Sequence, residues 1–318
     1  MSHTGIRGFY SLILIPFLLL ISCSGSLKEA DALYDAGDYK AAESSYRSSL
    51  DADPDNAQAH FMLGMSLQAQ NKHTEAKKEF EISYKLDKNN KKAITSLQVI
   101  YSKDAKSKLN AGEIEDAIAI YKKGYNLNKN DPGITLGLAQ AYTEYGLLTL
   151  AFELLEKAGR GGREKNRVEE IKTEIERRRT VAESNYVKGK KAYEDNNIVT
   201  AKKYLDKAIS NNRDSDDIRY YSFMSNGLYL YKKGSRWQIW DAIVEFGKAA
   251  EVRTNEAEPN YYLALGYLKK DDKDFENILS HYEKALELDT DGIFTSKIKK
   301  ELDKQRKRKK KLDEFWGK

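Results

Sequence analysis

Small and bulky residues recur along this chain in a fixed order. Each copy has a small or medium-sized residue, a bulky residue four positions later and a small residue seven positions later. These spacings place all three side chains on one face of an α-helix. The seven copies are Ala42, Tyr46, Ser49; Ala76, Phe80, Ser83; Ala117, Tyr121, Gly124; Ala151, Leu155, Ala158; Ala201, Leu205, Ala208; Ala242, Phe246, Ala249; and Ile278, Tyr282, Ala285. The pattern predicts seven helices that bury the same kind of face.

A second small residue lies upstream of each copy, again within a helical stretch, and marks a close contact between two helices. These residues are Ala30, Gly64, Ala105, Ala139, Gly189, Gly227 and Ala264. Between the two helices lie turn sequences such as Ala36-Gly37-Asp38 and Ala111-Gly112-Glu113, in which glycine can take the left-handed conformation that ends a helix. Each unit is therefore predicted to be a helical hairpin.

The starting residues of successive copies are separated by 34, 41, 34, 50, 41 and 36 positions. With this spacing, Gly37-Asp38-Tyr39 followed by Ala42, Tyr46 and Asp53-Pro54, and the stretch from Tyr282 to Asp289, resemble the consensus of tetratricopeptide repeats. The resemblance implies an all-α solenoid of helical hairpins wound as a right-handed superhelix. The sequence departs from the consensus in three ways: the large opening tryptophan is missing, Ile278 replaces alanine, and Asn196 and Asp271 replace the turn glycine.

The chain after residue 22 is predicted to have four parts. Residues 23–165 hold repeats 1–4, residues 166–181 form a linker helix that could run on into the next repeat, and residues 182–291 hold repeats 5–7. Residues 292–318 are predicted to form a capping helix and a basic C-terminal tail. The glycine cluster from Gly159 to Arg163 is not a phosphate-binding loop, because no strand precedes it and no Gly-Lys-Ser or Gly-Lys-Thr closes it. It is predicted to be a mobile loop.

Residues 1–22 read as a secretion leader, with Arg7 ahead of an apolar run from Phe9 to Ile21 that is too short to span a bilayer. The run ends in Leu20-Ile21-Ser22-Cys23, which resembles the lipobox of bacterial lipoproteins. The resemblance implies that Cys23 becomes the first residue and carries the acyl chains that anchor the protein. The alternative is a soluble leader with a chance cysteine. Because Ser24 is not aspartate, we expect the outer membrane, facing the periplasm.

Composition argues against an enzyme. The 318 residues are 40% hydrophobic and 32% charged, which is typical of a soluble helical chain. The single cysteine excludes an internal disulfide and a cysteine-based metal cluster. The four histidines show no metal-binding spacing, and no nucleophile, base and orienting group can be named together. We therefore predict a protein without a cofactor, a metal or a catalytic site.

The resemblance also implies where partners bind, because the fifth, ninth and twelfth positions of each tetratricopeptide repeat line the groove. In the last three repeats these positions are rich in Tyr, Met and Leu, residue types that anchor peptides and helices. The predicted groove residues are Tyr186, Lys190, Tyr193, Met224, Leu228, Tyr231, Tyr261 and Leu265.

Two further features suggest contacts. Trp237 and Trp240 are predicted to lie in a loop, where they either touch a partner or pack into the adjacent hairpin. The segment from Lys297 to Lys318 holds eleven Lys or Arg and four Asp or Glu, a net charge of +7. It either binds anionic lipid or an acidic partner, or is a solvated helix end. Its candidate residues are Lys304, Arg306, Lys307, Arg308, Lys309, Lys310 and Lys311.

These features predict a membrane-anchored, non-catalytic scaffold that binds protein partners in a bacterial cell-envelope complex. Nucleic acid is a poor partner for an exported lipoprotein. One alternative is a peptide- or solute-binding lipoprotein associated with a transporter. Another is a subunit that resembles the repeat lipoprotein of outer-membrane β-barrel assembly, although seven repeats exceed the usual five of that family.

Overall fold

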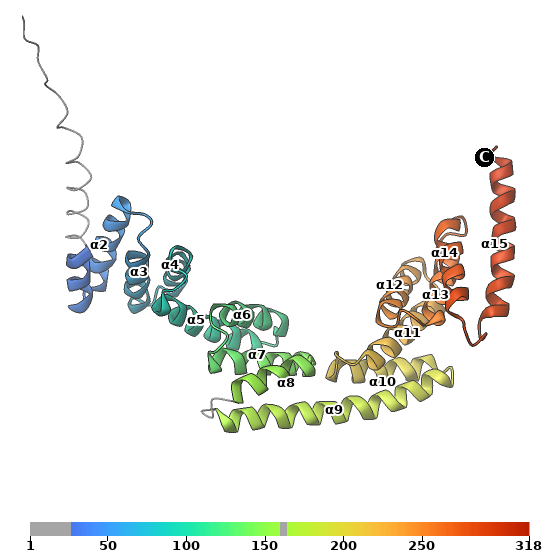
Figure 1. Cartoon of the computed structure of the whole chain (residues 1–318), viewed down its shortest axis with the longest axis horizontal. Coiled ribbons are helices and arrows are strands. Elements are labelled where there is room, and N and C mark those ends of the chain that lie inside the picture. The colour runs from blue at the N-terminus through green and yellow to red at the C-terminus, as the bar shows by residue number, and fades with distance from the viewer. Residues whose placement is uncertain (1–26, 160–163, 318) are drawn as a thin grey trace, which may run out of the picture. The chain divides into compact units, whose positions relative to one another are not determined.

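The computed structural model describes residues 27–159 and 164–317, and all regular secondary structure in these two stretches is helical. The predicted all-α fold is therefore confirmed. The chain divides into two compact units, residues 1–137 and 138–318, and the boundary falls inside helix α7 (Pro132–Tyr145) (Figure 1). The predicted leader (1–22), the lipidation site Cys23 and residues 160–163 of the loop predicted at 159–163 lie outside the described residues, whereas Gly159 is the last residue of α8.

Unit 1 is a series of antiparallel helices joined by short turns. Residues 27–35 are helical, and each helix from α2 to α6 packs on the next. These helices are α2 (Tyr39–Ala52), α3 (Ala57–Ala69), α4 (His73–Leu86), α5 (Lys91–Asn110) and α6 (Ile114–Leu127).

Unit 2 continues from the second part of α7 and repeats the same arrangement. Its further helices are α8 (Leu148–Gly159), α9 (Lys165–Glu194), α10 (Ile198–Asn211), α11 (Asp216–Lys233), α12 (Arg236–Val252), α13 (Ala257–Lys270), α14 (Phe275–Leu288) and α15 (Thr295–Phe315). From α8 to α15 each helix packs on the next one along the chain.

The helices interlock because glycines leave space for bulky side chains. A Cβ atom added to Gly64 would lie 2.6 Å from Cε1 of Phe80, and one added to Gly227 would lie 2.5 Å from Cε1 of Phe246. Both phenylalanines are fully buried. Since Cβ atoms do not approach other carbons this closely, only glycine permits these contacts. The predicted pairing of small and bulky residues within each hairpin is confirmed at these positions.

The turns inside the hairpins use the left-handed backbone conformation. Gly37 and Gly112 have φ angles of +81° and +78°. Where the consensus glycine is replaced, Asn196 takes the same conformation with φ of 56°, which asparagine tolerates better than most residues. The next residue, Asn197, then caps α10, because its side chain accepts a hydrogen bond from the backbone N–H of Thr200 at 3.2 Å.

Helix α9 joins the predicted linker to the following repeat. It is one helix of 30 residues, so the segment 166–181 and the first helix of the predicted fifth repeat are continuous. Its first half buries Val168, Ile171 and Ile175, and an ion pair of 3.4 Å joins Lys172 to Glu156 of α8. The linker is therefore packed against its neighbours.

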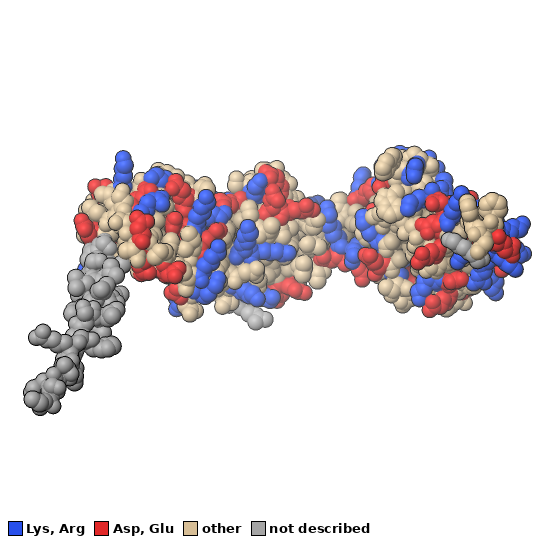
Figure 2. All heavy atoms as spheres, turned by 90° about the horizontal axis from the view of Figure 1, so that it is seen from above, with Lys and Arg blue, Asp and Glu red and all other residues tan. Residues whose placement is uncertain are grey.

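Helix α15 covers the last hairpin. Ile298 and Leu302 are buried in a cluster with Ile278 and Tyr282 of α14. The helix runs on to Phe315, so the basic residues predicted as a tail belong to the same helix as the covering segment. Within the described residues no helix combines the length and apolarity needed to cross a membrane. Acidic and basic side chains are mixed over the face seen in Figure 2.

Candidate partner-binding surfaces

Two of the predicted groove residues on α11 belong to the core. Met224 is fully buried and Leu228 is 6% exposed, in a cluster with Ile239 and Phe246 of α12 and Leu263 of α13. The prediction that Met224 and Leu228 line an open groove is therefore wrong. The physical reason is that their face of α11 is covered by α12 of the same hairpin.

The other predicted groove residues differ in how far they reach solvent. Tyr186 is buried in a core cluster with Leu205 of α10 and Ile218 of α11, and its ring packs on Tyr221 with centroids 5.9 Å apart, so the groove prediction is wrong for Tyr186 as well. The remaining five are partly exposed and lie on α9, α11 and α13, which are the first helices of the last three hairpins. They are Lys190, Tyr193, Tyr231, Tyr261 and Leu265.

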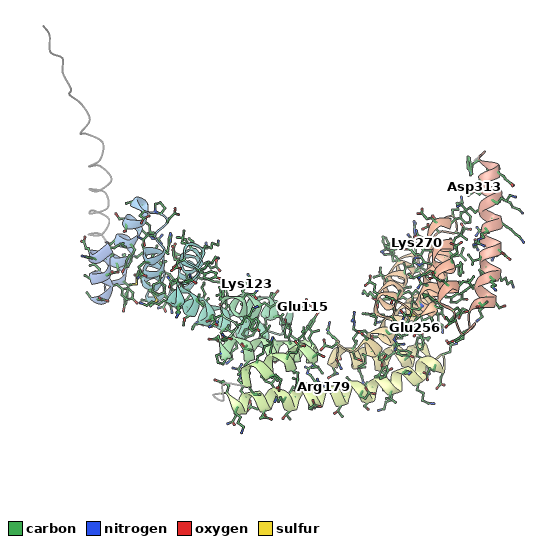
Figure 3. The ribbon with its side chains drawn as sticks, viewed as in Figure 1. Glu115, Lys123, Arg179, Glu256, Lys270 and Asp313 are labelled. Atoms are coloured by element: carbon green, nitrogen blue, oxygen red, sulfur yellow. The ribbon has the colours of Figure 1, made fainter. Side chains whose placement is uncertain are left out.

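A partly buried carboxylate joins α9, α11 and α13, the first helices of the last three hairpins. The hydroxyl of Tyr193 on α9 donates to Oε1 of Glu258 at 2.8 Å, and the hydroxyl of Tyr220 on α11 donates to Oε2 at 3.3 Å. Glu258 lies in the first turn of α13, next to the capping residue Glu256 that Figure 3 labels. Burial raises the pKa of Glu258, although both hydroxyl donors act to lower it. Burial also raises the pKa of both tyrosines, so they remain donors at neutral pH.

An aromatic cluster surrounds this carboxylate. The ring of Tyr221 packs edge-on against Tyr193 and Tyr220, with centroid distances of 5.4 and 5.2 Å. The guanidinium of Arg253 lies 4.3 Å from the ring centroid of Tyr220 and forms an ion pair with Asp217. Such contacts fix the orientation of the rings before any partner binds.

Sequence reasoning missed four members of this cluster, namely Tyr220, Tyr221, Arg253 and Glu258. They do not occupy the fifth, ninth or twelfth position of a repeat, so the family rule did not select them. The doublet Tyr220-Tyr221 and its counterpart Tyr261-Tyr262 in the next hairpin were the available signal.

A second cluster lies along α11 and α13. The Lys269 ammonium lies 4.5 Å from the Tyr231 ring centroid and donates to the Tyr231 backbone carbonyl at 3.0 Å. Tyr261 packs on Tyr262 and Phe294, with centroids 5.3 and 4.9 Å apart. Tyr231, Tyr261 and Leu265 therefore form a partly exposed apolar strip whose side chains are held by their neighbours.

The two predicted loop tryptophans belong to a helix. Ser235 caps α12 in a capping box with Gln238, so Trp237 and Trp240 lie in the first two turns of that helix. The prediction of a loop is wrong, because the serine starts the helix immediately after the Gly234 turn. Trp237 is 81% exposed and Trp240 is 44% exposed. With Arg236 and Lys270 they line a hollow of about 530 Å³.

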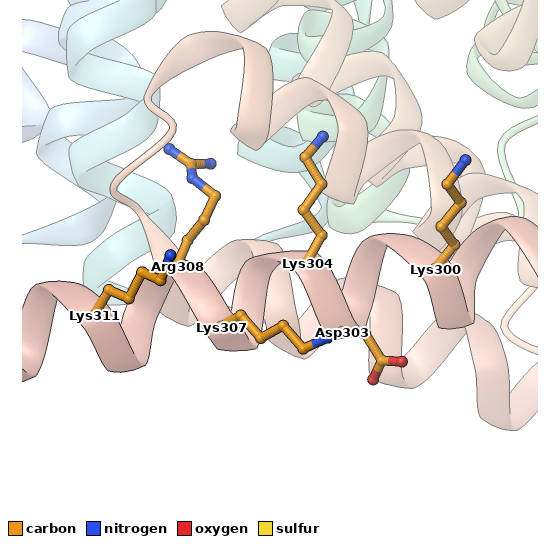
Figure 4. Close-up of a pocket in the computed structure, with 6 residues that line it drawn as sticks. All are labelled: Lys300, Asp303, Lys304, Lys307, Arg308 and Lys311. Atoms are coloured by element: carbon orange, nitrogen blue, oxygen red, sulfur yellow. The ribbon is translucent and has the colours of Figure 1, made fainter.

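The basic face of α15 borders another shallow hollow of about 480 Å³ (Figure 4). Its lining residues are Lys300, Asp303, Lys304, Lys307, Arg308 and Lys311. Four of the predicted basic residues form ion pairs, since Arg306 pairs with Glu283, Arg308 with Asp272, Lys304 with Glu301 and Lys310 with Glu314. All four are exposed pairs, which contribute little to stability.

Within residues 27–159 and 164–317, no three His, Cys, Asp or Glu side chains gather in a way that could hold a metal ion. Two of the three histidines there, His60 and His281, have structural contacts, and His73 is exposed. A ring nitrogen of His60 lies 2.7 Å from Glu79, and His281 stacks on Tyr267 with centroids 5.4 Å apart. Burial lowers the pKa of His281, which favours its neutral form.

Comparison with known families agrees with the helical hairpins in two parts of the chain. Two family models, both described as tetratricopeptide repeat, match residues 27–90 and 259–291. The chain has no significant match among curated proteins.

Among solved structures, the chain is similar to YrrB, described as a TPR protein with an unusual peptide-binding site. The identity is 19%, the match covers 70% of this chain and 97% of that one, and the TM-score is 0.30. A tetratricopeptide repeat protein from Parabacteroides merdae is 15% identical, with coverage of 90% and 99% and a TM-score of 0.36. A structure described as the TPR2AB-domain:pHSP90 complex of yeast Sti1 is 18% identical, with coverage of 79% and 98% and a TM-score of 0.33.

Proposed function

We propose that the chain is a non-catalytic scaffold that binds protein partners in a bacterial cell-envelope complex. The tetratricopeptide repeat models that match residues 27–90 and 259–291 support the scaffold role. In this proposal acyl chains on Cys23 hold the protein on a membrane. The expected location is the outer membrane, where the protein would face the periplasm. The observation that carries the proposal is a row of partly exposed side chains on α9, α11 and α13, the first helices of the last three hairpins. The row consists of Lys190, Tyr193, Tyr231, Tyr261 and Leu265.

This row suits a polypeptide partner. Tyr231, Tyr261 and Leu265 offer apolar area from two neighbouring helices, and Lys190 adds a cation on a third. Aromatic and leucine side chains at such positions anchor a helix or an extended peptide, because they bury a large area at a small cost in side-chain entropy. The ring contacts of Tyr261 with Tyr262 and Phe294 lower that cost further.

The membrane anchor rests on the sequence alone. The apolar run of the leader is too short to span a bilayer, and the only cysteine of the chain follows it in a sequence that resembles a lipobox. Several acyl chains hold a protein stably, since each buried methylene contributes about 0.8 kcal/mol. Mass spectrometry of the purified protein tests this part, and an N-terminal fragment with unmodified Cys23 would contradict it.

The test of partner binding is a pull-down from solubilised envelope. We expect Tyr231→Ala combined with Leu265→Ala to reduce partner recovery at least tenfold, while the helical circular dichroism signal is unchanged. The matched control is Val199→Ala combined with Val244→Ala, because these exposed apolar residues lie on the second helices α10 and α12. Equal recovery by both double variants would show that the row is not the binding surface.

The same experiment separates the proposal from the alternative of a peptide- or solute-binding lipoprotein of a transporter. A scaffold returns envelope proteins in stoichiometric amounts. A protein that comes back alone, and whose melting temperature responds to small molecules or free peptides, would be a solute-binding lipoprotein. Recovery of an outer-membrane β-barrel assembly protein would instead assign the chain to that machine.

A further inference from the structure

Four large apolar side chains are exposed in two distant segments of unit 2. Trp237 and Trp240 lie in the first turns of α12, and Phe315 and Trp316 lie at the end of α15. Phe315 and Trp316 are 77% and 67% exposed, and their rings pack edge-on with centroids 5.2 Å apart. Exposure of large apolar side chains to water costs free energy, so a cluster of this kind marks a surface that contacts a protein or a membrane.

Contacts place both segments at the same end of the unit 2 helices. The ammonium of Lys270, the last residue of α13, lies 4.4 Å from the Trp240 ring centroid. Two residues later, Asp272 in the α13–α14 turn forms an ion pair with Arg308 of α15. From Arg308 the helix continues by about 10 Å to Phe315. Figure 3 labels Lys270 and Asp313, which lie toward the same end of these helices.

Cations accompany the aromatic residues. Among the residues that the structure describes, neither Arg236 nor Lys270 forms an ion pair, although both line the hollow beside the tryptophans. From Thr295 to Phe315, α15 holds ten Lys or Arg and four Asp or Glu, a net charge of +6. The last part of this run, Lys309 to Lys311, is exposed and lies about one helical turn before the aromatic pair, with Leu312, Asp313 and Glu314 between them.

We propose that this end of unit 2, formed by the first turns of α12, the last turn of α13 and the C-terminal part of α15, docks on the surface of a bilayer that contains anionic lipid. Tryptophan prefers the headgroup region, where its ring is in an apolar phase and its N–H finds an acceptor. Lysine and arginine gain about 1 kcal/mol each near an anionic surface. This surface offers both kinds of residue side by side.

A bilayer fits better than an acidic peptide because of the extent of the surface. A peptide in the hollow of about 530 Å³ would cover Trp237 and Trp240 but leave Phe315 and Trp316 in water. A membrane is broad enough to meet all three elements at once. The docking would add a contact made by the polypeptide itself, at the opposite end of the sequence from Cys23.

The chain offers a direct reporter, because all three of its tryptophans belong to the proposed surface. Intrinsic fluorescence therefore reads the environment of this surface alone. The purified full chain is reconstituted with vesicles of phosphatidylcholine, with and without phosphatidylglycerol. We expect a blue shift of the emission, and quenching by brominated acyl chains, only when phosphatidylglycerol is present. The variant Trp240→Phe with Trp316→Phe leaves Trp237 as the single reporter of the α12 segment.

The charge requirement is tested with Lys309→Gln, Lys310→Gln and Lys311→Gln together. At about 1 kcal/mol per residue the docking constant should fall by roughly 100-fold. The matched control replaces three exposed lysines of unit 1, Lys91, Lys92 and Lys123, by glutamine, which should leave the fluorescence change intact. Equal weakening in both triple variants would show that only net charge matters and would overturn the proposal.

Two other results would also overturn the proposal. One is tryptophan emission that does not shift at any lipid composition, and the other is a blue shift on phosphatidylcholine alone as large as the shift with phosphatidylglycerol. A similar shift caused by polyglutamate without vesicles would assign the surface to an acidic protein partner instead. The inference does not rest on the lipid anchor, because fluorescence reads the depth of the indoles and not the attachment of the chain. Acylation of Cys23 is measured separately by mass.

Discussion

The contact between Gly227 of α11 and Phe246 of α12 offers a quantitative test of how the hairpins hold together. An added Cβ at Gly227 would lie 2.5, 2.6 and 3.0 Å from three ring carbons of Phe246. The ring has no room to move away, because it is fully buried and stacks on Tyr262 with centroids 5.3 Å apart. Gly227→Ala must therefore displace the ring or the helix.

The expected size follows from two opposing contributions. Overpacking of a core costs about 1–3 kcal/mol. Replacing glycine by alanine inside a helix returns about 1 kcal/mol of helix propensity. We expect the free energy of unfolding of Gly227→Ala to fall by up to about 2 kcal/mol. The matched control is Gly247→Ala in α12, where an added Cβ would meet nothing within 4 Å. This variant should gain the propensity contribution alone and be stabilised by up to about 1 kcal/mol.

The assay is urea unfolding of both variants, followed by circular dichroism. The difference between the two variants cancels the propensity contribution, so it measures the overpacking and should be about 1–3 kcal/mol. Two variants of equal stability would refute the interlocking of small and bulky residues as the source of hairpin stability.

Three further predictions concern single residues. Because burial raises the pKa of Glu258 in the folded protein above the ordinary value of 4.5, its contribution to stability is present below that pH and is lost as the pH rises through the folded pKa. The stability of the wild type relative to Glu258→Gln should therefore fall as the pH rises above 4.5, and a pH-independent difference between their urea midpoints would contradict this. Ser235→Ala removes the capping box of α12 and should cost about 1 kcal/mol in thermal unfolding, with an unchanged melting temperature as the contrary result. Asn196→Val should destabilise by about 1–2 kcal/mol and Asn196→Gly by much less, because valine resists a φ of 56°; equal losses in a urea titration would show that the turn is not strained.

The sequence predicts the hairpins well because their signals are local. The spacing of Ala42, Tyr46 and Ser49 reports one buried helix face, and all three side chains are buried in the structure. Gly37 and Gly112 mark turns through a backbone conformation that glycine takes at little cost.

The candidate surface is less predictable because it depends on contacts between repeats. A position rule places Met224 in the groove, but whether a side chain reaches solvent depends on the helix packed over it, and α12 covers Met224. The carboxylate of Glu258 meets Tyr193 at a separation of 65 residues, which no local pattern encodes. The spacing of Ser235 and Gln238 matches a capping box, so the helix start that the loop prediction missed is encoded locally.

The central claim is that the partly exposed side chains on α9, α11 and α13 contact a protein partner. Site-specific photo-crosslinking in cells tests this claim most directly. A photoreactive residue is placed at Leu265 on α13 or, as the control, at Val199 on α10. The account predicts a discrete crosslinked envelope protein from position 265 and none from position 199. No crosslink from position 265, or the same products from both positions, would contradict it.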